Sequence, residues 1–141
     1  MIKLDAGTTP VPDADSKPYY EYTKKHELRA QRCKACGSMR HPPGIMCPQC
    51  QSQDIEWRKL SGRGAIYSWE VIHHRIIPAF MEGPPYTVVL VEPEEQPGLR
   101  FLGNLLDCPR EQLRIGLPVE AVFEDHTPEV TLVQWRPRKG D

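Results

Sequence analysis

Four cysteines are placed so that they could hold one metal ion. They form two CxxC pairs, Cys33 with Cys36 and Cys47 with Cys50, and ten residues separate the pairs. Two such turns bring four thiolates together around a tetrahedral Zn²⁺. Four sulfur ligands leave no coordination position for water or substrate, so we expect zinc to have a structural role.

Other uses of these cysteines fit the sequence less well. Two disulfides would need an oxidising compartment, yet the segment before Cys33 is polar and shows no charged and apolar leader pattern. A thioredoxin-like redox site uses a single CxxC pair within a βαβ pattern, which is absent here. No apolar run approaches the roughly twenty residues that cross a bilayer. We therefore expect a cytoplasmic zinc protein with no membrane segment.

The remaining chemically active side chains do not form a recognisable catalytic set. His73 and His74 are adjacent on an expected strand, where neighbouring side chains point to opposite faces. Cys108 has no cluster of cations beside it to lower its pKa. Residues 124–126 (Glu-Asp-His) fit a solvated turn. The sequence thus supplies no pairing of nucleophile and base, and we expect no activity from this chain alone.

Charge is unevenly distributed along the chain. Residues 24–63 contain nine Lys and Arg against three acids, whereas residues 64–141 contain seven against twelve. The cysteine region is therefore basic and the remainder acidic. This suits contact of the cysteine region with an anion such as a phosphate group, and the alternative is a solvated basic face with no ligand. The candidate phosphate-binding residues are Arg29, Arg32, Lys34, Arg40 and Arg63.

Composition and local patterns divide the chain into four segments. Fifteen prolines and ten glycines in 141 residues favour short strands and turns over long helices. Ser16 is a helix N-cap candidate, Pro18 suits the first turn, and good helix formers follow. We expect a flexible arm over 1–15, a helix over 16–31, a rubredoxin-like zinc ribbon over 32–60 and a β barrel over 61–141.

Five strands are predicted after the glycine-rich junction Ser61-Gly62-Arg63-Gly64. Runs of apolar and β-branched residues recur between turn signals, which is typical of a small antiparallel barrel. They span 65–77, 86–91, 99–105, 119–123 and 130–135. Five strands in about eighty residues fit an OB fold, with an SH3-like barrel as the alternative. The fold class is mainly β.

Two apolar segments exceed what a small barrel can bury. One is the tyrosine-bearing helix, and the other is the run from Ile76 to Met81, which leads into a turn. Apolar loop residues outside a core often mark an interface, and the alternative for this run is that it simply caps the mouth of the barrel. The candidate interface residues are Tyr19, Tyr20, Ile77, Phe80 and Met81.

Several segments, taken in order, resemble one known family. They are the tyrosine helix, the two CxxC pairs with HPPGIMC between them, the junction WRKLSGRGAIYSW, and the strands PPYTVVLVE and IGLPVEAVFE. This order resembles the acyl-CoA-associated zinc-ribbon/OB-fold family, formerly a domain of unknown function, over residues 17–136. The hairpin at 92–97 departs from the pattern because it is longer and more acidic.

The resemblance implies an accessory subunit that has no chemistry of its own. Its partner would be a thiolase-superfamily enzyme, such as a thiolase or an aldolase of steroid side-chain degradation, or a MaoC-like hydratase. It also implies that the four cysteines bind zinc, that CoA or acyl-CoA is a shared ligand, and that two chains join a thiolase dimer in a heterotetramer. A single-stranded nucleic-acid binder is the alternative, and the acidic barrel weighs against it.

Overall fold

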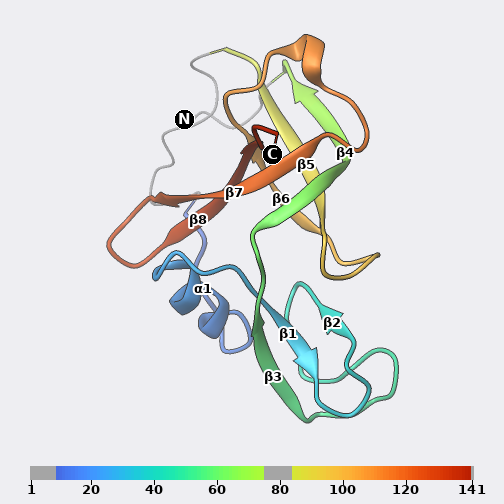
Figure 1. Cartoon of the computed structure of the whole chain (residues 1–141). Coiled ribbons are helices and arrows are strands. Elements are labelled where there is room, and N and C mark those ends of the chain that lie inside the picture. The colour runs from blue at the N-terminus through green and yellow to red at the C-terminus, as the bar shows by residue number, and fades with distance from the viewer. Residues whose placement is uncertain (1–8, 75–83, 141) are drawn as a thin grey trace.

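The structure is a computed structural model that describes residues 9–74 and 84–140. Helix α1 comes first, three strands follow around the cysteines, and five further strands come after them (Figure 1). The bounds are α1 Lys17–Thr23, β1 Arg29–Cys33, β2 Met39–Arg40, β3 Ile55–Lys59, β4 Arg63–Ile72, β5 Tyr86–Pro93, β6 Phe101–Leu105, the 3-10 turn η2 Arg110–Gln112, β7 Pro118–Asp125 and β8 Thr131–Pro137.

The first three strands form the sheet of the zinc ribbon. Their order is β2-β1-β3, and both neighbours of β1 are antiparallel to it. Gln31 in the central strand pairs with Arg40 on one side and with Trp57 on the other. Ala30 and Met39, on the opposite face, are buried. This face therefore packs toward the rest of the protein, and the cysteines lie at the far end of the sheet.

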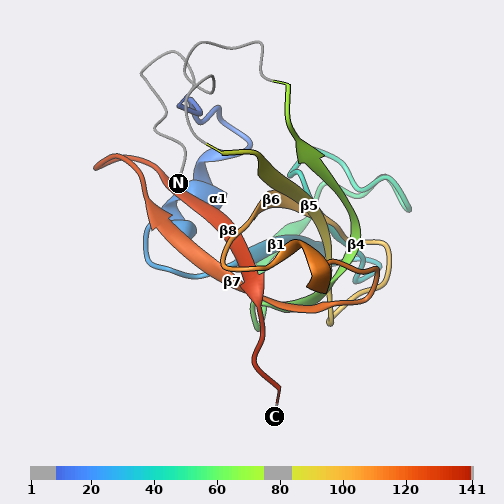
Figure 2. The same ribbon diagram turned by 90° about the horizontal axis from the view of Figure 1, so that it is seen from above.

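The other five strands close into a barrel. Their order is β4-β5-β6-β8-β7, with β4 also paired to β7 (Figure 2). All pairs are antiparallel except β6 with β8, which meet in parallel at Leu105 and Trp135. This is the five-stranded Greek-key arrangement of an OB fold. The expected mainly β fold, with a helix, a zinc ribbon and an OB barrel, is confirmed.

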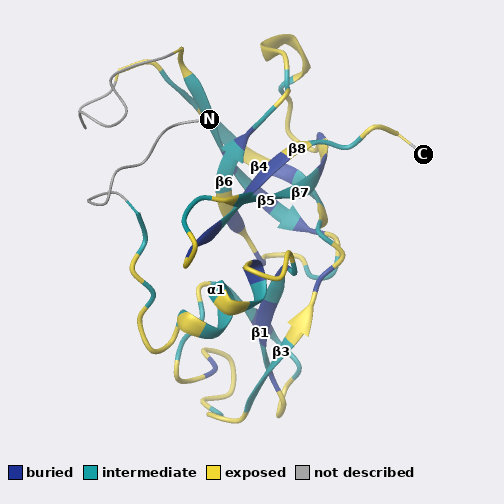
Figure 3. Ribbon diagram, turned by 90° about the vertical axis from the view of Figure 1, so that its left-hand side faces the viewer, coloured by how far each residue is buried: buried dark blue, intermediate teal, exposed yellow. Residues whose placement is uncertain are grey.

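One hydrophobic core joins the ribbon to the barrel. Trp135 and Phe101 are its largest buried side chains, and the same cluster includes Leu28, Ala30 and Met39 from the ribbon. Buried segments accordingly occur both in β1 and in the barrel strands (Figure 3). Burying a large apolar side chain stabilises a protein by about 1.5–3 kcal/mol. A core shared between both parts therefore holds them in one fixed arrangement.

The N-terminal helix is shorter than predicted. It ends at Thr23, whose buried hydroxyl donates a hydrogen bond to the Thr131 carbonyl oxygen of β8 at 2.9 Å. His26 then adopts a left-handed backbone conformation, with φ of 57°, and the chain is extended from Arg29. The prediction of helix up to residue 31 was wrong because pairing on both sides of β1 outweighs local helix propensity.

The strand boundaries also differ from those predicted. The first barrel strand was expected to run to residue 77, but β4 ends at Ile72. It has an irregular register between Ile66 and Ser68, which is typical of a β-bulge that bends a strand. Residues 1–8 of the expected arm lie outside the described residues, and Thr9 contacts the His126 ring at 3.2 Å.

The acidic hairpin between β5 and β6 fastens the barrel to the ribbon. The side-chain amide of Gln96 accepts a hydrogen bond from the Met39 backbone N–H at 2.9 Å and donates one to the Met39 carbonyl oxygen at 2.8 Å. It thus pairs with the edge of β2 as a neighbouring strand would. A carboxylate oxygen of Glu95 accepts from the Ser61 N–H. The hairpin that departs from the family pattern therefore has a structural role in this chain.

Candidate functional site

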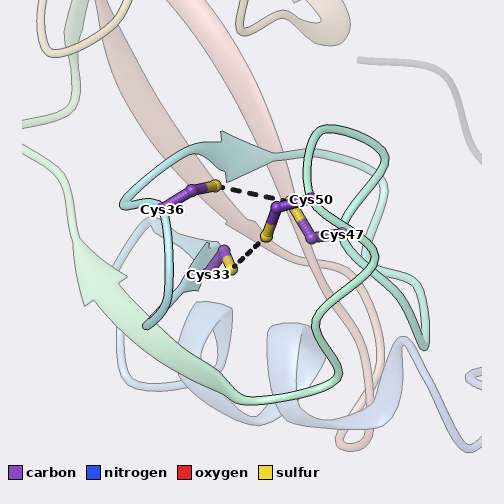
Figure 4. A group of neighbouring side chains, drawn as sticks. All are labelled: Cys33, Cys36, Cys47 and Cys50. Carbon is purple, nitrogen blue, oxygen red and sulfur yellow. Dashed lines mark hydrogen bonds between the residues drawn. The ribbon is translucent and has the colours of Figure 1, made fainter.

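The four cysteine sulfurs converge as a zinc site requires (Figure 4). All four Sγ atoms lie within 4.8 Å of one another, and the Cys33–Cys50 and Cys36–Cys47 separations are both 3.6 Å. A tetrahedral Zn²⁺ with Zn–S bonds of about 2.3 Å places its sulfurs about 3.8 Å apart. The residues present therefore fit Zn²⁺ held by four thiolates, and the zinc-ribbon prediction is confirmed.

The two CxxC turns repeat the same backbone hydrogen bonds. The N–H groups of Gly37 and Gln51 donate to the carbonyl oxygens of Cys33 and Cys47 at 2.8 and 2.9 Å, and both donors have positive φ. A hydrogen bond from the Cys36 N–H is the main factor that lowers the pKa of Cys33 from 9.0 to about 6. Backbone N–H groups that stabilise a thiolate also favour metal binding.

Three of the five basic candidates pair with carboxylates inside the chain. Arg29 contacts Glu27 at 2.7 Å, Arg32 contacts Glu56 at 2.6 Å, and Lys34 lies 3.9 Å from Asp54. Arg29 also lies over the Tyr22 ring, 4.4 Å from its centroid. These pairs neutralise much of the positive charge that the sequence concentrates in the ribbon.

The other two basic candidates have different surroundings. Arg40 donates one hydrogen bond to the Gly44 carbonyl oxygen at 2.9 Å, while its Nε and Nη1 atoms are buried without a partner among the described residues. Arg63 is exposed, and no ion pair forms at its side chain within the described part of the chain. Phosphate binding by these five side chains stays a prediction.

An aromatic stack connects the helix, the ribbon and the barrel. The His41 ring lies 4.9 Å from the Tyr19 ring and 4.3 Å from the Phe101 ring. Burial lowers the pKa of His41 to about 4, and its Nδ1 atom has no hydrogen-bond partner among the described residues. Burial also raises the pKa of Tyr19. His41 is therefore a neutral packing residue near pH 7.

The predicted interface residues fall into two groups. Tyr19 packs against the shared core, and Tyr20 is partly exposed next to it, with the two rings 5.3 Å apart and nearly perpendicular. Ile77, Phe80 and Met81 lie outside the described residues. The interface role of all five stays a prediction, and the inward packing of Tyr19 gives that residue a role within the chain.

A hollow opens where the helix, the ribbon and the barrel meet, and we call it the seam hollow because it follows the junction of β6 and β8. Its volume is about 410 Å³, and none of its lining side chains is an acid, a lysine or an arginine. Its lining includes Tyr19 and Tyr20 from α1, His41 after β2, Leu102 and Asn104 from β6, and Gln134 from β8.

The sequence reasoning did not single out Leu102 or His41. Leu102 is 66% exposed, although Phe101 and Leu105 at the two ends of the same strand are buried. The alternation of a strand, in which Phe101 and Leu105 point inward, would have indicated an outward leucine at 102. No pattern in the sequence indicates that the ring of His41 reaches the barrel core, because its contacts come from distant segments.

The histidine, cysteine and acidic side chains that the sequence offered for chemistry have structural surroundings instead. The Arg110 guanidinium lies 2.8 Å from the His73 ring, and burial raises the pKa of the Cys108 thiol. Hydrogen bonds from His26 and Thr131 lower the pKa of Asp125, which links α1 and the following turn to the barrel. Among the described residues, no helix is long and apolar enough to span a membrane.

Comparison with known proteins gives two family matches in the expected order. Residues 21–56 match the family model described as "ChsH2, rubredoxin-like zinc ribbon domain". Residues 57–124 match "ChsH2, C-terminal OB-fold domain". The boundary between the two matches lies within β3, the last strand of the ribbon sheet, and the barrel begins with β4 after a short connection.

Three curated relatives cover different shares of their own lengths. A DUF35 domain-containing scaffold protein of Methanocaldococcus jannaschii is 40% identical over 71% of this chain and 70% of its own. A probable enoyl-CoA hydratase alpha subunit of Thermomonospora curvata is 40% identical over 91% of this chain, which spans only 39% of that relative. The benzoylsuccinyl-CoA thiolase subunit BbsA of Thauera aromatica is 40% identical over 30% of this chain and 29% of its own.

A solved structure matches nearly the full length of the chain. A chain of the Ltp2-ChsH2(DUF35) aldolase superposes with a TM-score of 0.81 and 40% identity, and the match covers 92% of this chain and 98% of that one. The zinc ribbon and OB barrel thus occur in the same order and arrangement in both proteins. This chain belongs to the DUF35 family of ChsH2-like zinc-ribbon/OB-fold proteins.

Proposed function

We propose that this chain is a non-catalytic accessory subunit that docks on a thiolase-superfamily enzyme and helps to form its CoA or acyl-CoA site. The observation that carries the proposal is the match to a chain of the Ltp2-ChsH2(DUF35) aldolase over nearly the whole of both chains. The thiolase subunit among the relatives supports the same class of partner. The reaction belongs to the breakdown of steroid or related acyl-CoA thioesters.

The arrangement of the molecule suits a docking subunit. The shared core and the Gln96 contacts hold the ribbon and the barrel in one orientation, so surfaces from both parts can meet a partner together. Four thiolates on zinc would make the end of the ribbon rigid without offering an open coordination position. A preformed surface of this kind loses little conformational entropy on binding.

The basic residues have unequal access to a phosphate of CoA. At Arg29 and Arg32 an incoming phosphate must displace a paired carboxylate, since both guanidinium groups are occupied by glutamates. Arg63 is exposed and needs no such exchange. We therefore assign Arg63 as the first of the five candidates to test for phosphate contact.

Co-expression with candidate partners tests the docking proposal. The zinc-loaded chain is co-expressed in turn with an Ltp2-type aldolase, a thiolase and a MaoC-like hydratase, and each complex is sized by light scattering after gel filtration. We expect stable complexes with a thiolase-superfamily dimer, with two chains of 16.2 kDa adding about 32 kDa. Binding to the hydratase alone, or to none of the three, would contradict the proposal.

Two cysteine variants separate the ribbon from the rest of the fold. Cys33→Ser removes a zinc ligand and is expected to abolish complex formation. Cys108→Ser changes a thiol in the barrel, away from the zinc site, and is expected to leave the complex intact. Equal loss in both variants would show that the test reports general instability.

A further inference from the structure

The seam hollow has the size and chemistry of a small-molecule site. At about 410 Å³ it lies within the range of roughly 300–1,000 Å³ that is usual for such sites. It is built from three separate segments, namely α1, the turn after β2 and the seam of β6 with β8. A ligand in this hollow could contact all three segments at once, which a single exposed residue does not allow.

The hollow exposes apolar surface that the fold does not cover. Leu102 lines it and is 66% exposed, and Val88 and Leu132 lie beside it on the neighbouring strands. Isolated exposed leucines are common, but a leucine in a concave surface of mixed apolar and polar lining is a typical ligand contact. An apolar chain seated there would remove this surface from water.

Polar groups in the hollow are available for hydrogen bonds. The side-chain amide of Asn104 and the hydroxyl groups of Tyr19 and Tyr20 have no hydrogen-bond partner within the described part of the chain. These groups can donate to or accept from amide and thioester groups, whereas a phosphate finds no cation among the lining residues.

We infer that the seam hollow binds the uncharged acyl-pantetheine portion of an acyl-CoA thioester. The acyl chain contacts Leu102 and its apolar neighbours, and the pantetheine amides meet Asn104 and the tyrosine hydroxyls. The inference rests on the proposed function, because the thioester would be that of the partner enzyme. It adds the location of the site and the part of the ligand that this chain recognises.

Titration of the full zinc-loaded chain with S-octanoyl-pantetheine tests the inference. Amide resonances in ¹⁵N-labelled protein report binding, and we expect shifts at Gly103, Asn104 and Gln134. S-Acetyl-pantetheine should bind at least about tenfold more weakly, since each additional methylene group buries apolar surface. Adenosine 3′,5′-bisphosphate, which lacks both the acyl chain and the amides, should produce no shifts in the hollow.

A matched pair of variants locates the site. Leu102→Glu places a charge in the hollow and is expected to weaken octanoyl-pantetheine binding by at least about tenfold. Ile115→Glu is the control, because Ile115 is 65% exposed and does not line the hollow. Both positions are exposed, so neither variant is expected to disturb the core.

The outcomes distinguish this inference from the proposed function. Absence of shifts in the hollow at millimolar octanoyl-pantetheine overturns the inference, and so does equal binding by wild type and Leu102→Glu. Either result leaves the co-expression test unaffected. If the wild type binds no thioester while Leu102→Glu loses the partner enzyme, the hollow is a protein-docking surface and the inference is wrong.

Discussion

Protonation of His41 is expected to make the fold less stable in mild acid. The imidazole is packed between Tyr19 and Phe101, and burial is the cause that lowers its pKa from 6.5 to about 4. A buried imidazolium in this stack would have no carboxylate partner among the described residues. Folding therefore favours the neutral ring, and the unfolded chain takes up a proton first as the pH falls.

The size of this effect follows from the two pKa values. Well above pH 6.5 both states carry a neutral ring, so His41 contributes almost no pH dependence there. Between pH 6.5 and pH 4 the unfolded state binds more protons, and the free energy of unfolding falls. The loss is about 1 kcal/mol between pH 7.5 and 5.5, and it approaches about 3 kcal/mol below pH 4.

Urea unfolding at pH 7.5 and 5.5 measures this loss. The variant His41→Phe keeps an aromatic ring in the stack and removes the titrating group. We expect the wild type to lose about 1 kcal/mol more than His41→Phe between these two pH values. His74→Gln is the control, because His74 is exposed and its replacement should preserve the full pH dependence.

The comparison between variants also accounts for the zinc site. Zinc binding to thiolates weakens in acid, but this contribution is the same in wild type and His41→Phe when zinc is in equal excess. The difference between the two proteins therefore reports the imidazole alone. If His41→Phe lost as much stability as the wild type, His41 would not be buried and neutral as described.

Three further perturbations test the zinc site, the attachment of the ribbon to the barrel, and the close approach of β4 to β5. Removing zinc with a chelator should unfold the ribbon in wild type and in Cys108→Ser alike, as seen by loss of dispersed ribbon resonances and recovery on adding zinc; a ribbon that stayed folded would exclude a structural metal. Gln96→Ala should lower the free energy of unfolding by about 1–2 kcal/mol and speed hydrogen exchange at the edge of β2; unchanged exchange would argue against the clamp. Gly64→Ala should cost more than about 2 kcal/mol, because its Cβ would lie 2.5 Å from a β5 carbonyl oxygen, whereas Gly44→Ala meets no atom within 4 Å and serves as the control in thermal melts. Equal melting temperatures would refute the close approach.

Local sequence was enough to predict the zinc site and the class of fold. Each CxxC turn is complete within a few residues, so spacing alone specifies the hydrogen bonds of the turn and the direction of both sulfurs. Strands alternate over short windows, and five of them were found at nearly correct positions. Ser16 stands at the predicted N-cap position, but its side chain makes no capping hydrogen bond to the helix and pairs with Asp13 instead.

The end of the helix and the state of the basic residues depended on distant partners. Residues 29–31 have good helix propensity, yet they pair with β2 and β3, which only the folded chain brings beside them. The sequence shows an excess of positive charge in the ribbon, but Glu27 and Glu56 neutralise two arginines by contact. Charge counts along a sequence do not reveal such pairs.

The sequence by itself determined the metal ligands, the order of the two parts and the family. The tertiary structure decided that His41 is buried, that Gln96 clamps the ribbon to the barrel, and that Leu102 lines a hollow. Each of these features joins residues about fifty or more positions apart. Their physical basis is packing and desolvation between segments, which exist only after the chain has folded.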